Sequence, residues 1–136
     1  MAELLEERVA VAGARPLVLV VNVEPRFGEA VSRFLEERAW HVQAAGDARE
    51  PLDRWALGPR LVVTDIDGTD MDCFELLQEL SALEPRPGIL VRVPQSAAAL
   101  IDEALEDLGV DAVLERPCRL DDVEAALARV FRGRQP

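Results

Sequence analysis

Five short apolar segments alternate along this chain with segments of helical periodicity. After the first apolar run, apolar side chains recur from Phe27 to Leu35 at the i, i+3, i+4, i+7 and i+8 positions of an amphipathic helix. The apolar runs are rich in valine, leucine and isoleucine, which is typical of parallel strands covered on both faces. These runs span residues 17–21, 41–45, 61–65, 89–93 and 111–115.

The segments between the apolar runs carry signals for helix ends. Pro25 suits the first turn of a helix, and Ser96 suits the N-cap of the fourth helix. Asp72 and Glu75 have the spacing of a capping box, and Gly109 suits the left-handed residue that follows a helix. Strands that alternate with helices in this way predict an α/β fold with a doubly wound, five-stranded parallel sheet. In such sheets, chemistry gathers at the carboxyl ends of the strands.

The residue types exclude several classes of function. The chain carries a formal net charge of −11, which argues against binding to the phosphate backbone of a nucleic acid. Every basic residue is an arginine, so chemistry that needs a lysine amine is excluded. Two cysteines and one histidine predict neither a disulfide framework nor a zinc site. No apolar run approaches the roughly 20 residues of a membrane span.

A length of 136 residues suits a single domain. We expect residues 1–15 to form a short leader and residues 16–133 to form the domain. The first residues lack the basic start and the apolar block of a signal peptide, which predicts a cytoplasmic location.

Asp65 is the strongest candidate for a reactive residue. It ends the third apolar run, LVVTD, and so lies at the predicted carboxyl edge of the sheet. A carboxylate in this position can attack a phosphoryl group and form an acyl phosphate. The reaction needs a cation, normally Mg²⁺ held by several oxygen ligands. A plain surface carboxylate at a strand end is the alternative interpretation.

Three sequence blocks resemble the receiver domain of bacterial response regulators. They are VLVVNVEP at 18–25, LVVTDIDGTDMDCFELL at 61–77 and LGVDAVLERPCRLDDVEAAL at 108–127. The resemblance covers roughly residues 16–132, with the blocks in the family's order. It implies the flavodoxin-like (βα)5 fold, with strand order 2-1-3-4-5, and a role in two-component signalling rather than an enzyme.

The resemblance also implies roles for individual residues. Asp65 occupies the place of the phospho-accepting aspartate, and Asp67 the place where a backbone carbonyl completes the Mg²⁺ shell. Arg116 and Pro117 match the family's Lys–Pro pair, whose peptide bond is usually cis.

Several of the family's pocket residues are replaced in this chain. Asn22 and Val23 stand where the family has an acidic pair, while Glu24 keeps an acidic residue nearby. Arg116 replaces the lysine. Fewer carboxylates weaken Mg²⁺ binding, because this hard cation depends on charged oxygen ligands.

The family's switch serine or threonine is also missing. By counting, its place falls on Arg92, Val93 or Pro94, none of which carries a hydroxyl. Together these changes predict a receiver-like module with weak or absent Asp65 phosphorylation, which signals by protein contact. We expect no cofactor or only weakly bound Mg²⁺, at Asp65 and Asp67. A phosphorylation-competent, Mg²⁺-dependent response regulator is the alternative.

An arginine could take the place of the missing metal ion. Arg116, and also Arg92, could reach Asp65 and pair with it directly, since the guanidinium fork matches a carboxylate. Such a pair would hold the pocket in one state without Mg²⁺. In the plainer alternative, Arg92 reaches solvent and Arg116 simply replaces the lysine.

The segment DIDGT at 65–69 also resembles the first motif of haloacid-dehalogenase-type phosphatases. In that interpretation Asp65 is the nucleophile and Asp67 the general acid. Two observations weigh against it: a strand–helix–strand–helix unit precedes the motif, and no lysine exists for the family's third motif. Asp121 and Asp122, which could supply a further motif, fall in the first turn of a predicted helix, where acids favour the helix dipole.

The partners implied are a histidine kinase or phosphotransferase if the pocket works, and a cognate signalling protein if it does not. The resemblance places a possible homodimer contact on the fourth helix, fifth strand and fifth helix. Leu100, Ile101 and Val113 are the apolar candidates on that face. Neither nucleic acid nor a membrane is expected as a partner.

Overall fold

A computed structural model describes the chain over most of the expected domain. The described residues are 15–21, 23–45, 59–66, 71–84, 86–95 and 105–132. Nearly all of the expected leader lies outside them, as do the expected cap Ser96 and the surface candidates Leu100 and Ile101.

The strands form one parallel sheet with the order β2-β1-β3-β4-β5, as the sequence predicted. β1 (Leu17–Val21), β2 (His41–Ala45) and β3 (Leu61–Asp65) have the predicted bounds. β4 (Gly88–Pro94) is one residue longer at each end than predicted, and β5 (Ala112–Arg116) begins and ends one residue later. Arg116 therefore ends the last strand.

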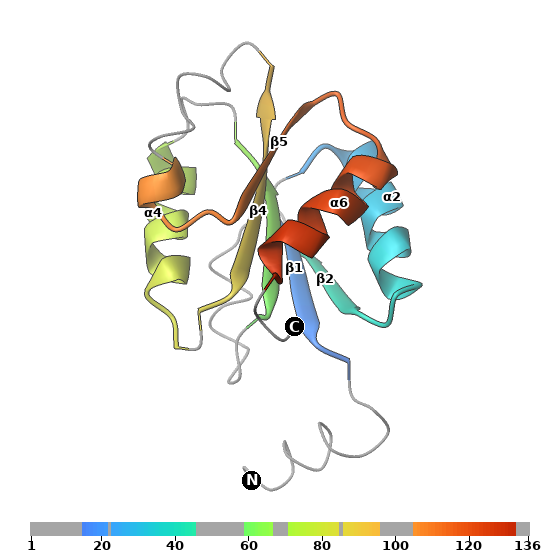
Figure 1. Cartoon of the computed structure of the whole chain (residues 1–136), viewed down its shortest axis with the longest axis horizontal. Coiled ribbons are helices and arrows are strands. Elements are labelled where there is room, and N and C mark those ends of the chain that lie inside the picture. Colours follow the sequence, from blue (N-terminus) through green and yellow to red (C-terminus); the bar gives the residue numbers. More distant parts are fainter. Residues whose placement is uncertain are drawn as a thin grey trace, which may run out of the picture.

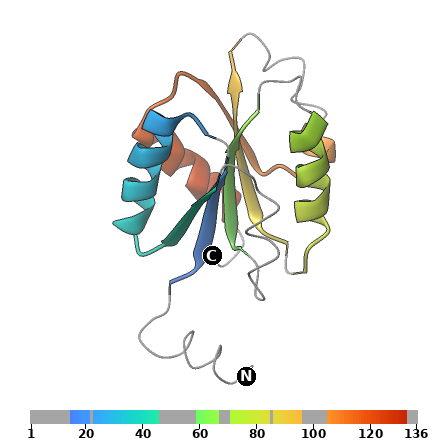
Figure 2. The same cartoon turned by 180° about the vertical axis from the view of Figure 1, so that it is seen from behind.

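Helices cover both faces of the sheet (Figures 1 and 2). α2 (Pro25–Glu36) and α6 (Leu120–Val130) lie on one face, and α4 (Met71–Ser81) lies on the other. Pro25 occupies the first turn of α2, as predicted. Residues 105–107 are helical, and Gly109 follows them with φ of 82°, in the left-handed conformation that the sequence indicated.

Alternate residues of β1 point into two separate core layers. Val18 and Val20 pack with α2 and α6, whereas Leu19 and Val21 pack on the other face with α4. All four side chains are almost fully buried. This double burial explains why β1, an inner strand of the sheet, consists only of valine and leucine and has no polar face.

None of the helices in the described segments is long and apolar enough to cross a membrane.

The α4 layer offers a test of the packing. Leu77 is fully buried in it, so Leu77→Ala should lower the free energy of unfolding by about 2–5 kcal/mol through the cavity it leaves. The neighbouring Gln78 is exposed, and Gln78→Ala should change that free energy by less than about 0.5 kcal/mol. Urea unfolding followed by circular dichroism measures both. Equal effects of the two substitutions would contradict this account of the core.

Candidate functional site

Asp65 and Arg92 face each other at the carboxyl edge of the sheet. Asp65 is the last residue of β3, and the register of the parallel pair sets it opposite Arg92 on β4. Residues in register on neighbouring strands point to the same face, so the two side chains meet. The sheet itself therefore brings the carboxylate and the guanidinium together.

The two side chains form a bidentate ion pair. Arg92 donates from Nε to Oδ1 of Asp65 at 2.7 Å and from Nη2 to Oδ2 at 2.8 Å. Arg92 is only 4% exposed and Asp65 only 8%. A fork of two short charge-assisted hydrogen bonds is the strongest arrangement that an arginine and a carboxylate can adopt. Burial makes each partner depend on the other, because a lone buried charge is costly.

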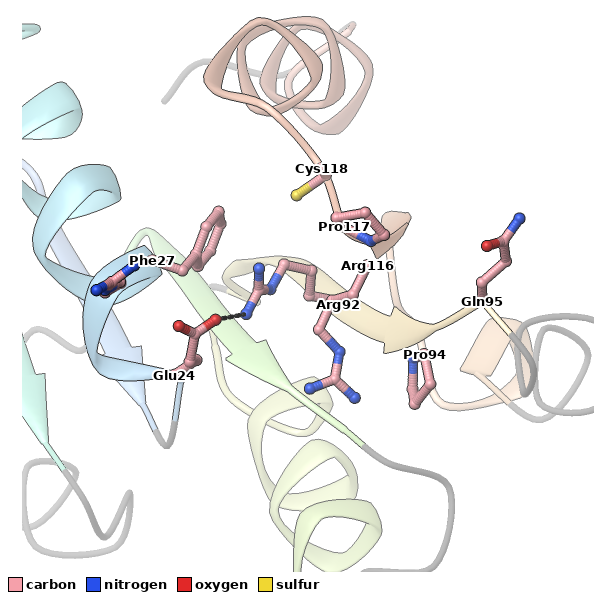
Figure 3. Close-up of a pocket in the computed structure, with 9 residues that line it drawn as sticks. Glu24, Phe27, Arg92, Pro94, Gln95, Arg116, Pro117 and Cys118 are labelled. Carbon is pink, nitrogen blue, oxygen red and sulfur yellow. Dashed lines mark ion pairs between the residues drawn. The ribbon is translucent and has the colours of Figure 1, made fainter.

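The residue before α2 and the first turn of α2 surround this ion pair. The backbone N–H of Glu24 donates to Oδ2 of Asp65 at 3.0 Å. The Glu24 carboxylate lies 3.7 Å from Nη2 of Arg92 (Figure 3), but its side chain is 55% exposed, so this contact is weak. Phe27 lies under the guanidinium, with the Arg92 Cζ 3.7 Å from the ring centroid, a cation–π geometry.

The environment shifts the pKa values of Arg92 and Cys118. Burial alone would lower the pKa of Arg92, but the hydrogen bonds and the negative charge of Asp65 outweigh it, and the pKa is raised. Burial raises the pKa of the Cys118 thiol, and the hydrogen bond and positive charge of Arg92 offset this only in part. Arg92 therefore stays charged, and Cys118 is a thiol rather than a thiolate at neutral pH.

The partner of Asp65 is Arg92, and none of the contacts that the structure describes joins Arg116 to Asp65. The reason is the strand order: β4 lies between β3 and β5, so Arg92 is one strand closer. The Arg116–Pro117 peptide bond is cis, as the resemblance implied. Arg116 Nε is buried, and no described atom accepts a hydrogen bond from it.

The three residues considered for the switch position have different surroundings. Arg92 binds Asp65, Val93 is fully buried in the core layer of α4, and Pro94 lines a cavity at the edge of the sheet. No hydroxyl among these three approaches Asp65, because none of them carries one.

The remaining candidates contribute little to a cation site. Val23 is partly buried against the core beneath α2 and offers no ligand atom. Asn22 and Asp67 lie outside the described residues. In the described segments, no group of three or more histidine, cysteine or acidic residues could hold a metal ion. Because both Asp65 oxygens accept from Arg92, the described residues do not fit an Mg²⁺ site.

An open cavity of about 780 Å³ lies over this edge of the sheet. Its lining comes from the start of α2, the ends of β4 and β5, and the segment before α6 (Figure 3). Arg92 extends toward Glu24, whereas Arg116 extends away from that ion pair.

The family model of the response regulator receiver domain matches residues 18–128. The chain belongs to this family. As a receiver domain it is a module of two-component signalling. No match was found among curated protein sequences.

Solved receiver domains share the fold. The non-phosphorylated receiver domain of HemR from Leptospira biflexa is 24% identical, with a TM-score of 0.71, and the match covers 90% of this chain and 98% of that one. The chemotaxis response regulator CheY4 of Vibrio cholerae is 22% identical, with a TM-score of 0.68 and coverages of 85% and 98%. At these identities the two likenesses show the fold alone.

A third structure is that of a response regulator protein from Burkholderia pseudomallei with a phosphorylated aspartic acid, a calcium ion and citrate. It is 28% identical, with a TM-score of 0.65, and the match covers 82% of this chain and 66% of that one.

The phosphatase interpretation is not favoured. The matched family is that of receivers, and Asp65 ends the third strand of the chain rather than the first. Asp121 and Asp122 lie in the first turn of α6, where Asp122 accepts a hydrogen bond from the backbone of Arg119. This contact gives Asp122 a helix-capping role.

Sequence reasoning missed the roles of Phe27 and Cys118 at this receiver site. Phe27 belongs to the apolar stripe of α2, which predicts packing against the core, and its ring also contacts the Arg92 guanidinium. Its place in the first turn of the helix, directly after the β1 edge, was the signal available. Cys118 forms a hydrogen bond with Arg92, and the two residues are brought together only by the tertiary fold.

The ion pair should dominate the stability of this edge. Arg92→Met removes the guanidinium but leaves the buried Asp65 carboxylate, so we expect the free energy of unfolding to fall by about 3–5 kcal/mol. Chemical denaturation measures the change. Arg33→Met, at an exposed position of α2, is the control and should have an effect below about 0.5 kcal/mol.

The double variant Arg92→Met with Asp65→Leu removes both charges and should regain most of the lost stability. If Arg92→Met lowers the free energy of unfolding no more than the control Arg33→Met does, the ion pair does not stabilise the domain.

The raised pKa of Cys118 predicts slow alkylation. In a Cys73→Ser background Cys118 is the only thiol, and its rate with iodoacetamide should rise with pH at a higher midpoint than in the urea-unfolded chain. By linkage, the thiol form favours the fold below the unfolded pKa, and this stability is lost as pH rises through the folded pKa. A folded midpoint below the unfolded one would contradict the assignment.

Proposed function

We propose that this receiver domain signals by protein contact, with Asp65 held by Arg92 and with weak or absent phosphorylation. The observation that carries the proposal is the bidentate, buried ion pair at the acceptor position. Phosphoryl transfer to a carboxylate requires a free oxygen for attack and a cation for the developing charge. In this chain Arg92 occupies both oxygens, and it is itself the cation beside them.

Attack by Asp65 would first require the fork to open. Opening it would leave a guanidinium and a carboxylate partly buried without their mutual hydrogen bonds, which is costly in free energy. The Phe27 ring and the Glu24 N–H add contacts that would also be disturbed. The paired form is therefore the stable state of the site, and the domain stays in one conformation that a partner can recognise.

The proposal assigns the domain no enzymatic activity, a cytoplasmic location and a cognate signalling protein as its partner. A histidine kinase could be that partner through docking alone. Homodimerisation through the fourth helix, of which residues 105–107 are described, together with β5 and α6 stays a prediction. Val113, its described apolar candidate, is partly buried against the core, so little of its side chain is free for a partner.

Acetyl phosphate with Mg²⁺ tests the proposal. Under conditions that phosphorylate the Burkholderia pseudomallei response regulator, wild-type protein should form little or no acyl phosphate, because Arg92 competes for the Asp65 oxygens. Intact-protein mass spectrometry measures the product, and Asp65→Asn provides its baseline. Amide resonances of Glu24 and Arg92 should not move in an Mg²⁺ titration. Stoichiometric acyl phosphate on Asp65 would overturn the proposal.

A further inference from the structure

We propose that Glu24 is a second acceptor for the Arg92 guanidinium, which transfers from Asp65 to Glu24 when the buried ion pair opens. Glu24 is the N-cap residue of α2, so this exchange changes the first turn of that helix. The inference goes beyond the proposed function, which concerns the closed ion pair, and describes the state that follows its opening. It rests on the geometry of three side chains and not on whether Asp65 accepts a phosphoryl group.

Arg92 lies between two carboxylates. Its Nη2 donates to Oδ2 of Asp65 at 2.8 Å, and the same nitrogen lies 3.7 Å from Oε2 of Glu24. The dashed line in Figure 3 marks the second contact. Each Nη of a guanidinium carries two hydrogens, so one nitrogen can donate to two acceptors. A movement of the Glu24 carboxylate by about 1 Å would bring it within hydrogen-bond distance of Nη2.

The two acceptors differ in how firmly they are held. The side chain of Asp65 is almost fully buried, whereas that of Glu24 is 55% exposed. Although Glu24 is the N-cap residue, its side chain makes no capping hydrogen bond to the first turn of α2, a turn that the structure describes in full. Little packing therefore opposes a rotation of the Glu24 side chain toward the guanidinium.

A buried guanidinium needs a negative partner. Arg92 is almost fully buried, and its Cζ lies 3.7 Å from the ring centroid of Phe27. If the Asp65 carboxylate is lost as a partner, the positive charge is left in a poorly hydrated position, which is costly in free energy. Rotation of Arg92 into water would give up the contact with the ring. Exchange of one carboxylate for the other keeps both the ring contact and an ion pair.

The first turn of α2 is tied to both partners of the closed pair. The backbone N–H of Glu24 donates to Oδ2 of Asp65 at 3.0 Å. Phe27, in the same turn, lies against the guanidinium of Arg92. A change in the partner of Arg92 therefore acts on this turn through its backbone and through its aromatic ring.

Close packing carries such a change into the helix. Gly28 lies so near the preceding segment that a Cβ atom there would be 2.9 Å from Cγ2 of Val23. A shift of residues 23 and 24 therefore reaches α2 by direct contact. Pro25 and Arg26 of the same turn are exposed, so the closed and the exchanged states present different surfaces to a partner protein.

Asp65→Asn keeps the shape of the side chain and removes its charge, so it mimics the open ion pair. Urea unfolding followed by circular dichroism measures the effect of Glu24→Gln in two backgrounds. In the wild type the unfolding equilibrium constant should change by less than about twofold, since the contact is long and exposed. In Asp65→Asn the constant should rise at least about tenfold, because Glu24 is then the partner of a buried charge.

Two controls assign this effect to the guanidinium of Arg92. Glu29→Gln, at an exposed position further along α2, should change the unfolding equilibrium constant by less than about twofold in either background. A background with both Asp65→Asn and Arg92→Met has no guanidinium for Glu24 to accept. In it, Glu24→Gln should again change the constant by less than about twofold.

NMR distinguishes a new ion pair from a general loss of packing. The signals that disappear in Arg92→Met identify the guanidinium protons of Arg92. In Asp65→Asn, their exchange with water should become at least about tenfold faster after Glu24→Gln, the effect of losing one charge-assisted hydrogen bond. In the wild type, Glu24→Gln should leave this exchange unchanged. The backbone amides of Phe27 and Gly28 should shift in Asp65→Asn but not in Glu29→Gln.

Equal effects of Glu24→Gln in the wild-type and the Asp65→Asn backgrounds would overturn the inference. Unchanged amide signals of Phe27 and Gly28 in Asp65→Asn would do the same, as would a Glu24 effect that persists in Arg92→Met. An Asp65→Asn chain that does not fold would also count against it, because Glu24 is expected to keep the guanidinium paired. These measurements use no phosphoryl donor, so acyl phosphate on Asp65 would refute the proposed function and leave this inference intact.

Discussion

The buried pair between Asp65 and Arg92 is the interaction on which the carboxyl edge of this domain depends. Two opposite charges lie at the tips of neighbouring strands, with both oxygens of the carboxylate bound by one guanidinium. Neither charge could be buried alone, because a buried charge without a partner destabilises the protein. Removing one partner of such a pair typically lowers the free energy of unfolding by about 3–5 kcal/mol. The entry to α2 completes the site with a backbone donor from Glu24 and the ring of Phe27.

The parallel sheet explains why one residue, Arg92, can change the surroundings of Asp65. A parallel sheet with two covered faces gathers its strand ends at one edge, where the resemblance expects Asp65 to be the acceptor. In this chain the positive charge next to that carboxylate comes from the protein itself. Among the described residues, the charge of Asp65 is balanced by that of Arg92.

The same edge has a second electrostatic feature, which is separate from the first. Arg92 is satisfied by Asp65, whereas Arg116 contributes a cation whose Nε lacks an acceptor among the described residues. Arg116 stands where the resemblance expects the family's lysine, and a different arginine, Arg92, binds Asp65.

The sequence by itself determined the five strands to within one residue and the start of α2, because these follow from local periodicity and from helix-end signals, while the resemblance supplied the strand order. It also identified Asp65 and named the two arginines that could reach it. Only the tertiary structure decided between Arg92 and Arg116, and only it brought Phe27 and Cys118 to the guanidinium. The physical reasons are strand order, which places β4 rather than β5 beside β3, and register, which pairs Arg92 rather than Val93 or Pro94 with Asp65. The hydrogen bonds between β3 and β4, formed by residues far apart in the chain, fix which side chain faces the carboxylate.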